Sequence, residues 1–353
     1  MSRQNDVALN ASVFRPSAIP ETCHALNKAL MDLQAGQPNW WELITTWSLF
    51  LKVGAQNFRQ MRLRGETAFP KPVVLECGQS FSIPSRQKGR DIPCRIITPE
   101  GNGTPSGVFM HIHGGGWVLS DEMSQDSMLK SYADTANVVA VSVGYRLAPE
   151  FPFPSGPEDC YDAAEWLVDN AEKKFGAPFK FMGGESAGAH LSTLTAFHLL
   201  NHAEDKYSSF NLKGLVLQYG AYDLSYTPSM YTYRPGQRLI LDRETVDHFI
   251  DAFLPDPKVD RKHASISPLY FDFASLAAAG KYLPPAIFTC GTEDILLDDT
   301  VFMSAKWQMA GGETFVKIVP GAPHGFSLFP PKLAAGTAET LMLIGQFLNG
   351  KAQ

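Results

Sequence analysis

The spacing of the hydrophobic residues changes near position 70 of the chain. Before it, apolar side chains recur every three or four positions, in groups punctuated by Pro20 and Pro38. Such spacing forms one apolar face of a helix, so we expect two or three helices there. We assign residues 1–70 to an N-terminal helical segment that forms a small cap or an arm. The residues that carry this pattern are Ala25, Leu26, Ala29, Leu30, Leu33, Trp40, Ile44, Trp47 and Leu51.

Short and nearly continuous apolar runs take over after Pro70. Runs of this length that are rich in β-branched residues predict buried strands. We expect strands at 73–75, 92–97, 108–112, 138–143, 179–183, 215–218, 286–290 and 315–319, and helices at 159–174, 187–200, 243–254 and 341–348. Alternation at this spacing predicts an α/β fold, with helices on both faces of a mostly parallel central sheet. Residues 71–353 are therefore assigned to the main domain.

The stretch from 222 to 268 interrupts this alternation. It is rich in tyrosine and proline and holds one amphipathic helix, in front of which Asp242 stands in the N-cap position. We predict that this stretch is a second cap insertion, lying over the edge of the sheet where the parallel strands end.

Composition and charge narrow the class of protein. The 353 residues are 44% hydrophobic and 19% charged, as in ordinary globular domains. The formal net charge of −6, without any basic run, argues against nucleic acid as a partner. The apolar stretches are too short to span a bilayer, and residues 1–6 lack the apolar core of a signal peptide. We expect no membrane association and a cytoplasmic location.

The cysteines and histidines show no spacing typical of metal ligands. An odd number of cysteines without a Cys-x-x-Cys pair predicts reduced thiols, most of them buried. We therefore expect neither a bound metal nor a cofactor. The five cysteines are Cys23, Cys77, Cys94, Cys160 and Cys290.

Ser186 is the strongest candidate for chemistry. It lies in Gly184-Glu185-Ser186-Ala187-Gly188, between a short predicted strand and an apolar helix. A sharp strand-to-helix turn holds such a serine in a strained backbone conformation with its hydroxyl exposed. The flanking glycines are required because a Cβ there would clash across the turn. The context predicts that Ser186 is a nucleophile.

A run of three glycines follows the predicted strand 108–112 and His113. Glycine lets the backbone approach a ligand closely, with N–H groups pointing at it, as an oxyanion hole requires. We predict that Gly114 and Gly115, together with Ala187 behind the nucleophile, donate these N–H groups. His113 is expected to hold the loop in place and to take no part in the chemistry.

A serine nucleophile needs a general base, and the base needs a carboxylate that orients it. Of the nine histidines, His324 alone follows the last predicted strand in a Gly/Pro-rich loop at the carboxyl edge of the sheet, where active sites of open α/β sheets lie. We predict His324 as the base. Asp294 is the predicted acid because it follows a strand and lies between Ser186 and His324 in chain order. Glu293 and Asp298 are its competitors.

Together these motifs resemble the hormone-sensitive lipase family of α/β-hydrolases, over the chain from about residue 71 to its end. The segments that carry the resemblance are His113–Gly116, Gly184–Gly188, Tyr145–Glu150 with Phe153-Pro154, Asp159, Asp294 with Leu296 and Asp298, and Pro323–Phe326. The resemblance implies the α/β-hydrolase fold with an N-terminal helical cap. It also implies carboxylesterase activity without a cofactor, and frequently a homodimer. Asp159 falls where that family has an Asp, and we expect it to be structural, bonding the adjacent loop.

Two positions depart from the family pattern. Glu185 precedes the nucleophile where Asp or Thr is common, so the hydrogen bonds of the turn can differ. His190 stands where Asn is common, which affects the packing of the helix behind the nucleophile. Neither departure removes a catalytic group.

The expected reaction is hydrolysis of small-molecule esters with short to medium acyl chains, through an acyl-enzyme. A closed cap and the absence of a large mobile apolar surface argue against long-chain lipids as substrates. A binding protein of the hormone-receptor type is disfavoured because Ser186 and His324 are both present, and a lyase because Ser186 is not replaced by Thr. Hydrolysis of amides or lactones needs the same groups and stays open.

Overall fold

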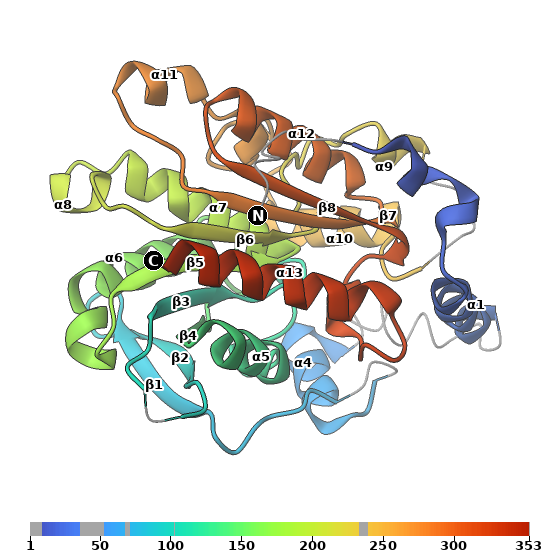
Figure 1. The fold of residues 1–353 in the computed structure, drawn as a ribbon, viewed down its shortest axis with the longest axis horizontal. Helices are drawn as coiled ribbons and strands as arrows, with labels where there is room; N and C mark the ends of the chain where they lie inside the picture. The colour runs from blue at the N-terminus through green and yellow to red at the C-terminus, as the bar shows by residue number, and fades with distance from the viewer. Residues whose placement is uncertain (1–8, 36–52, 68–70, 102, 233–238, 353) are drawn as a thin grey trace.

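The computed structural model describes residues 9–35, 53–67, 71–101, 103–232 and 239–352 (Figure 1). Its centre is an eight-stranded sheet with the order β1-β2-β4-β3-β5-β6-β7-β8. The first two strands run antiparallel to their neighbours, and the other pairs are parallel. The strands are β1 (Gln79–Pro84), β2 (Asp91–Ile97), β3 (Gly107–Ile112), β4 (Val138–Val143), β5 (Phe179–Glu185), β6 (Gly214–Gln218), β7 (Ala286–Glu293) and β8 (Thr314–Pro323).

Helices cover both faces of this sheet, as the alternation of the sequence predicts. The described α-helices are α1 (Glu21–Ala35), α4 (Ala55–Arg64), α5 (Asp126–Ala136), α6 (Ser155–Phe175), α7 (Ala187–Leu200), α8 (Asp205–Ser208), α9 (Ser229–Thr232), α10 (Arg243–Phe253), α11 (Phe273–Ala278), α12 (Leu297–Met309) and α13 (Ala335–Ala352). Short 3₁₀ turns are η1 (Ala11–Phe14), η2 (Pro16–Ala18), η3 (Pro268–Tyr270) and η4 (Phe326–Leu328).

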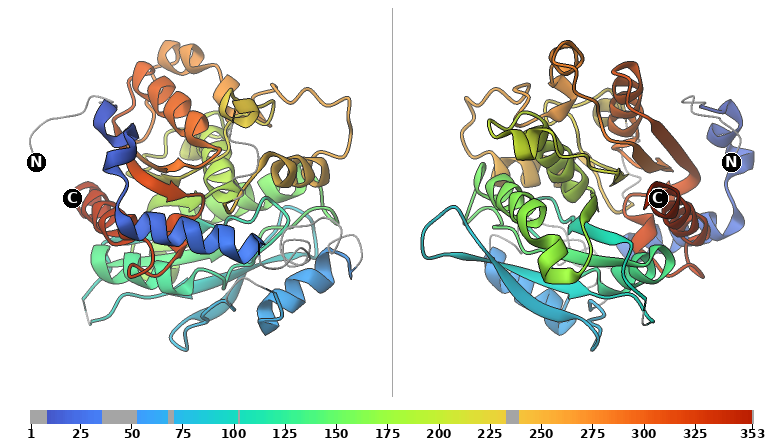
Figure 2. Two further views of the ribbon diagram at one scale, coloured as in Figure 1. Left: turned by 90° about the vertical axis from the view of Figure 1, so that its right-hand side faces the viewer. Right: turned by 60° about the vertical axis from the view of Figure 1, so that its left-hand side comes forward.

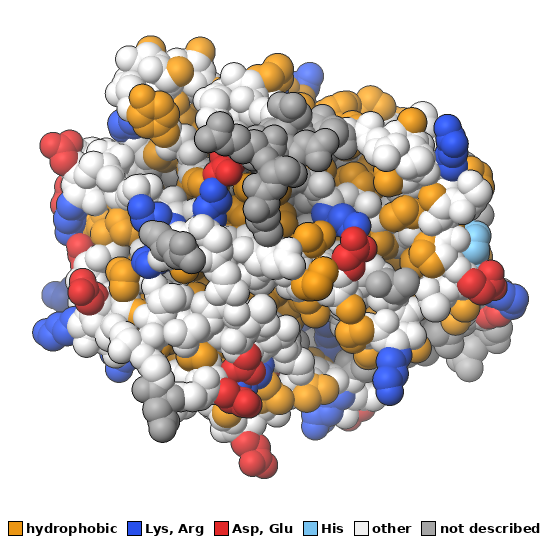
Figure 3. All heavy atoms as spheres, viewed as in Figure 1, with side chains coloured by type: hydrophobic (Ala, Val, Ile, Leu, Met, Phe, Trp, Pro, Cys, Tyr) orange, Lys and Arg blue, Asp and Glu red, His pale blue; other side chains and the backbone are white. Residues whose placement is uncertain are grey.

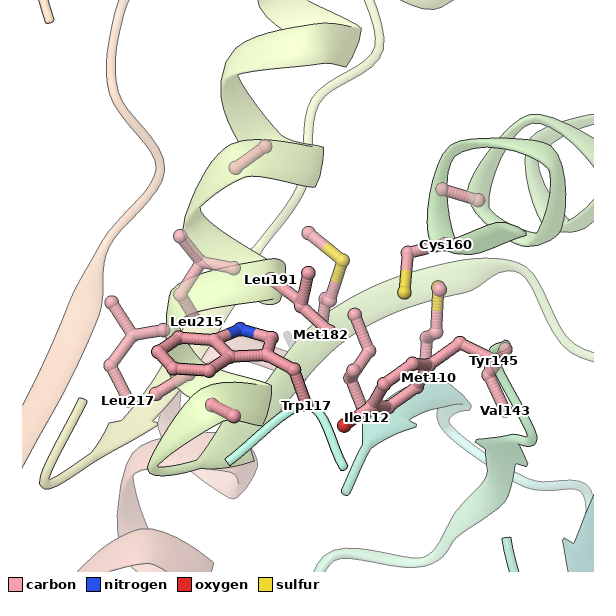
Figure 4. Close-up of a cluster of buried hydrophobic side chains, with 14 of the residues drawn as sticks. Met110, Ile112, Trp117, Val143, Tyr145, Cys160, Met182, Leu191, Leu215 and Leu217 are labelled. Atoms are coloured by element: carbon pink, nitrogen blue, oxygen red, sulfur yellow. The ribbon is translucent and has the colours of Figure 1, made fainter. Parts of the chain in front are cut away.

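The apolar core is divided by the sheet into two layers. Successive side chains of a strand point to opposite faces, so Phe109 belongs to the layer that includes residues of α5 and α13, whereas Met110 belongs to the layer that includes residues of α6, α7 and α12. Figure 4 shows part of the second layer, where Trp117 lies beside Leu215 and Leu217 of β6, and Met182 of β5 lies near Leu191 of α7. Apolar burial of this kind stabilises the fold by roughly 25 cal/mol per Å².

The structure confirms the strands predicted from residue 92 onward, β4 at the predicted residues and the others with ends shifted by one to four residues. It also confirms the helix behind Ser186 and the helix behind Asp242, whose carboxylate accepts the Thr245 N–H at 2.8 Å. The helices α5 and α12, which the sequence analysis did not identify, complete the covering of the sheet.

The strand predicted at 73–75 is wrong. Val73 and Val74 are 62% and 47% exposed, and Leu75 has no strand partner within the described residues. Its N–H donates to the Asp126 carboxylate at 2.9 Å and its C=O accepts from Arg95 at 2.7 Å, so side chains satisfy this backbone. The edge strand is instead β1, in a stretch to which the sequence analysis assigned neither a strand nor a helix.

Parts of both predicted cap segments lie at the carboxyl ends of the parallel strands. In the left-hand view of Figure 2, α4 from the N-terminal segment and α10 from the insertion lie on the same side of the molecule. By contrast, α1 lies against the edge strand β8, where the Asn27 amide donates to the Gly321 carbonyl at 2.8 Å. Trp40, Ile44, Trp47 and Leu51 fall outside the described residues.

On the face drawn in Figure 3, acidic and basic side chains are interspersed among apolar ones. The described helices do not include one with the length and apolar character needed to cross a membrane. All five cysteines are free thiols, and Cys77 is the exposed one.

Candidate active site

Ser186 occupies a strained turn between β5 and α7. Its backbone has φ of 56° and ψ of −120°, a conformation that residues other than glycine rarely adopt. A Cβ on Gly184 or on Gly188 would lie 2.0 or 1.9 Å from the carbonyl oxygen of Ile112. Both flanking glycines are therefore needed for the turn to pass so close to β3, as the sequence predicts.

His324 and Asp294 lie beside this serine. The imidazole Nε2 of His324 is 2.9 Å from the hydroxyl oxygen of Ser186, and its Nδ1 is 2.8 Å from a carboxylate oxygen of Asp294. The other oxygen of Asp294 accepts the Leu296 N–H at 2.9 Å, which fixes the carboxylate. Asp294 and His324 are 2% and 8% exposed, so their hydrogen bonds are largely shielded from water.

Asp298, one of the two competing carboxylates, has another partner. Asp298 accepts the Ser229 N–H at 2.7 Å, at the start of α9. The next residue, Asp299, is fully buried and accepts the N–H groups of Tyr222 and Asp223 at 2.6 and 2.8 Å. Burial raises the pKa of Asp299 to about 7. Of the carboxylates considered from the sequence, Asp294 is thus the one that the structure brings to His324.

The glycine-rich loop lies against the nucleophile turn, but one predicted donor needs correction. The Gly114 N–H donates to the Glu185 carboxylate at 3.0 Å, so it is not free to bind a substrate oxygen. Among the described residues, the N–H groups of Gly115, Gly116 and Ala187 donate to no acceptor. Gly115 and Gly116 have φ of +115° and +61°, which turns this stretch of backbone toward the cavity. The sequence analysis passed over Gly116.

His113 does not contact the triad. Its ring stacks on Tyr145 with centroids 4.3 Å apart, and its Nδ1 lies 2.8 Å from the Gly114 carbonyl oxygen. Burial lowers the pKa of His113 to about 4, which favours the neutral ring. These contacts agree with the expectation that His113 supports the loop.

The two departures from the family pattern are both buried and both hydrogen-bonded. His190 accepts the indole N–H of Trp117 at its Nδ1, 3.0 Å away, and its Nε2 lies 2.7 Å from the carbonyl oxygen of Ile266. Burial lowers the pKa of His190 to about 4. Glu185 binds the loop at Gly114 and also contacts His111, whose Nε2 is 2.9 Å away. In the sequence analysis His111 is no more than a position in the predicted strand 108–112.

Asp159 has the structural role that the resemblance implies. It is fully buried, accepts the Arg146 N–H at 3.0 Å, and forms ion pairs with the side chains of Arg146 and Arg90. These contacts hold the segment after β4 against α6.

A cavity of about 180 Å³ opens above Ser186 and is mostly apolar. The glycine loop and Tyr219 form its floor, while α4 and α10 contribute its far wall. The sequence analysis did not identify the individual residues of this wall. The three-residue spacing of Val246 and Phe249 does indicate that both lie on the same face of α10. The apolar wall residues include Phe58, Ile240, Leu241, Val246, Phe249, Leu296 and Leu328.

Away from this cavity, the fold brings together three groups of the kind that bind metals: Glu165, His198 and His202. The Nε2 atoms of His198 and His202 lie 2.6 and 3.7 Å from one carboxylate oxygen of Glu165. The Nδ1 of His202 accepts the Glu204 N–H at 3.0 Å, which in a neutral ring leaves the proton on Nε2. That tautomer directs a proton, not a lone pair, at the site, so we interpret this cluster as a hydrogen-bond network.

Comparison with known proteins agrees with this geometry. A family model described as alpha/beta hydrolase fold matches residues 109–328. The chain is 32% identical over 292 residues to carboxylic ester hydrolase LipN of Mycobacterium tuberculosis, covering 80% of this chain and 73% of that protein. It is 30% identical to an arylesterase of Saccharolobus solfataricus, and the match covers 83% of this chain and 90% of that protein. A hyperthermophilic esterase from Pyrobaculum calidifontis superposes with a TM-score of 0.76 at 26% identity, covering 95% and 99%.

The chain therefore belongs to the α/β-hydrolase family. Within it, the motifs and the relatives confirm the resemblance to the hormone-sensitive lipase group, and the chain is an enzyme of that group.

Proposed function

We propose that this enzyme is a carboxylesterase that acts through Ser186, His324 and Asp294. The observation that carries the proposal is the unbroken chain of hydrogen bonds from Asp294 through His324 to the Ser186 hydroxyl, at 2.8 and 2.9 Å. The relatives named carboxylic ester hydrolase and arylesterase support the same reaction class.

In the proposed mechanism, the Ser186 oxygen attacks the ester carbonyl while Nε2 of His324 takes the hydroxyl proton. Asp294 accepts from Nδ1, which holds the required tautomer and stabilises the imidazolium that forms. The alcohol leaves with the proton from His324, and an acyl-enzyme remains. Water activated by the same imidazole then attacks the acyl carbonyl and releases the acid.

The negative charge on the carbonyl oxygen develops next to the N–H groups of Gly115, Gly116 and Ala187. Such donors, fixed before the reaction starts, stabilise the transition state more than the ground state, and one of them typically contributes about 10²–10³ in rate. This set replaces the earlier prediction, because the Gly114 N–H is bound to Glu185.

The substrates we propose are small esters with short to medium acyl chains. The cavity of about 180 Å³ is mostly apolar and is bounded by residues of α4 and α10, which leaves limited room for a long chain. We further propose residues 1–70 and 222–268 as two cap segments on a catalytic domain of 71–353, with no cofactor, and assembly of the chain as a homodimer.

Hydrolysis of p-nitrophenyl esters from acetate to laurate tests the proposal. We expect turnover with a maximum at short or medium chains, and a loss of about 10⁴-fold or more in Ser186→Ala. Ser209→Ala, at an exposed hydroxyl, serves as the matched control and should retain activity. A folded wild-type protein with neither a burst nor turnover would contradict the reaction, and a maximum at laurate would contradict the chain length.

Amide hydrolysis uses the same groups and is measured in parallel. We expect p-nitroanilides to react far more slowly than the matching esters, since the amine is the poorer leaving group. A higher kcat/KM for the anilide would make the protein an amidase.

A further inference from the structure

Two titratable side chains outside the triad lie directly behind the nucleophile. Glu185 is the last residue of β5 and His111 lies on β3, and they are 1% and 0% exposed. An oxygen of the Glu185 carboxylate is 2.9 Å from Nε2 of His111. Neither group contacts Ser186 or His324 by a hydrogen bond in the described structure, so the mechanism above does not use them.

The register of the sheet explains why these groups meet. His111 lies opposite Ser142 on β4 and opposite Gly183 on β5. Glu185 is two residues beyond Gly183, so its side chain projects from the same face as His111. The Nδ1 of His111 is 2.9 Å from the Ser142 hydroxyl oxygen. A buried polar row therefore crosses β4, β3 and β5 on the face covered by α5.

One assignment of protons satisfies every member of this row. The Ser142 hydroxyl donates to Nδ1 of His111. The Nε2–H of His111 in turn donates to one oxygen of Glu185. The second oxygen of Glu185 accepts the Gly114 N–H at 3.0 Å. A buried carboxylate is costly unless its oxygens are paired, so both contacts are needed to keep Glu185 in this place.

The position of Glu185 in the chain gives these contacts a consequence for the reaction. The carboxylate joins Gly114, the residue before Gly115, to the strand end just before Ser186. Because Gly114 has no Cβ, its backbone lies close to that strand; a Cβ there would be 2.7 Å from the Glu185 carbonyl oxygen. The Glu185 side chain thus links the backbone next to Gly115 with the backbone next to Ala187, and it fixes the distance between the N–H groups of these two residues.

We propose that Glu185, held by His111, is a positioning residue that sets the spacing of the oxyanion donors. This inference rests on the proposed function. Glu185 borders the cavity but is only 1% exposed, and both of its carboxylate oxygens are bound by protein groups. It therefore acts through Gly114, while His111 and Ser142 fix the carboxylate from behind. The loop and the nucleophile turn, 71 positions apart at Gly114 and Glu185, then form one rigid unit.

Glu185→Gln tests the proposal, because a Gln side chain offers one acceptor oxygen for two donors. We expect kcat per active site on p-nitrophenyl acetate to fall about 10- to 100-fold with KM nearly unchanged, since a misplaced donor weakens the transition state alone. Inhibition by an alkyl trifluoromethyl ketone, whose adduct carries an oxyanion, should weaken by the same factor. Active sites are counted by labelling to completion with a fluorophosphonate.

The matched control is Glu165→Gln, which breaks the Glu–His pair on α6 and α7 away from the cavity. It should leave kcat and inhibition unchanged. A purely structural role of Glu185 would lower the melting temperature and the fraction of labelled protein, but not kcat per labelled site. Unchanged kcat per site and unchanged inhibition in Glu185→Gln would overturn the proposal while the wild-type esterase activity stood.

Two further variants approach the same carboxylate from behind. Ser142→Ala removes only the hydroxyl that donates to His111 at the end of the row, and it should lower kcat per site about threefold to fivefold with KM unchanged. This milder variant decides the question if Glu185→Gln does not fold, and wild-type kcat per site would then count against the proposal. The double variant His111→Gln/Glu185→Gln should lose no more kcat per site than Glu185→Gln alone, since His111 acts through Glu185. Additive losses of kcat per site would show that His111 acts independently of Glu185.

Discussion

The indole N–H of Trp117 donates to Nδ1 of His190 at 3.0 Å, which ties the glycine loop to the helix behind the nucleophile. On its other side the same imidazole reaches the Ile266 carbonyl oxygen at the end of the insertion. Trp117 in turn stacks on Phe253 of α10, with ring centroids 4.8 Å apart. One buried histidine thus connects the oxyanion loop, the nucleophile helix and the segment over the cavity.

Replacing His190 should therefore destabilise the protein in a pattern set by its two partners. His190→Leu leaves the Trp117 N–H and the Ile266 carbonyl without partners, at a cost of about 2–5 kcal/mol in the free energy of unfolding. His190→Gln can still accept from one and donate to the other, so we expect less than half of that loss. Urea denaturation at pH 8 measures both; equal losses would show that packing alone matters.

The same histidine should contribute to acid sensitivity. Its pKa is lowered to about 4 in the folded protein, below the ordinary value of about 6.5, so the unfolded chain binds more protons in that window. Stability is then lost as the pH falls from about 6.5 to about 4. Unfolding measured at pH 8, 6 and 4.5 should show a shallower decline for His190→Gln than for the wild type. The exposed His263→Gln is the control and should follow the wild-type curve.

Asp299 should act on stability with the opposite sign. Burial raises its pKa from 3.8 to about 7, so the folded protein binds more protons than the unfolded chain between these values. The free energy of unfolding contributed by this group decreases as the pH rises from about 4 to about 7, and changes no further above. The free energy of unfolding of Asp299→Asn, compared with that of the wild type at the same pH, should therefore rise by on the order of 3 kcal/mol between pH 4.5 and pH 8. Asp256→Asn, at an exposed carboxylate, should show no such gain.

Asp294→Asn should separate geometry from charge in the proposed triad. The amide keeps the size of the side chain but favours the wrong tautomer of His324, so kcat should fall about 10³- to 10⁴-fold while the melting temperature changes little. Steady-state rates on p-nitrophenyl acetate measure this. Asp298→Asn, in the carboxylate that caps α9, should stay within a few-fold of the wild type; a comparable loss there would reopen the choice of acid.

Phe249 should control the length of the acyl chain. Its ring lies on α10 in the wall of the cavity, so close to the loop that a Cβ on Gly116 would be 2.4 Å from it. Phe249→Ala enlarges the cavity, and we expect the ratio of kcat/KM for octanoate over acetate to rise about tenfold. Phe302→Ala, at a half-exposed ring on α12, is the comparison. An unchanged ratio would place the acyl chain elsewhere.

Several features could be predicted because they depend on neighbours along the chain. The apolar runs of β4 and the helix Ala187–Leu200 match the structure closely, since the alternation and periodicity that define them are local. The turn at Ser186 needs its two glycines within a five-residue motif. The order of Ser186, Asp294 and His324 follows from which loops lie at the carboxyl edge of a parallel sheet.

The failures have a common cause in contacts made across the sheet. Val73 and Val74 form an apolar run, but Arg95 and Asp126 satisfy the backbone at Leu75 in place of a strand. Among the described strands β1 pairs with β2 alone, and its apolar pattern is weak, so local periodicity does not identify it.

By itself, then, the sequence determined the fold class, the nucleophile turn and the candidates for the base and its acid, because each depends on short-range patterns. Only the tertiary structure decided which N–H groups are free beside Ser186. The Gly114 N–H is bound by a carboxylate from another strand, and that carboxylate is held by His111 from a third position in the chain. Such hydrogen bonds depend on the register between strands, which no local pattern of residues specifies.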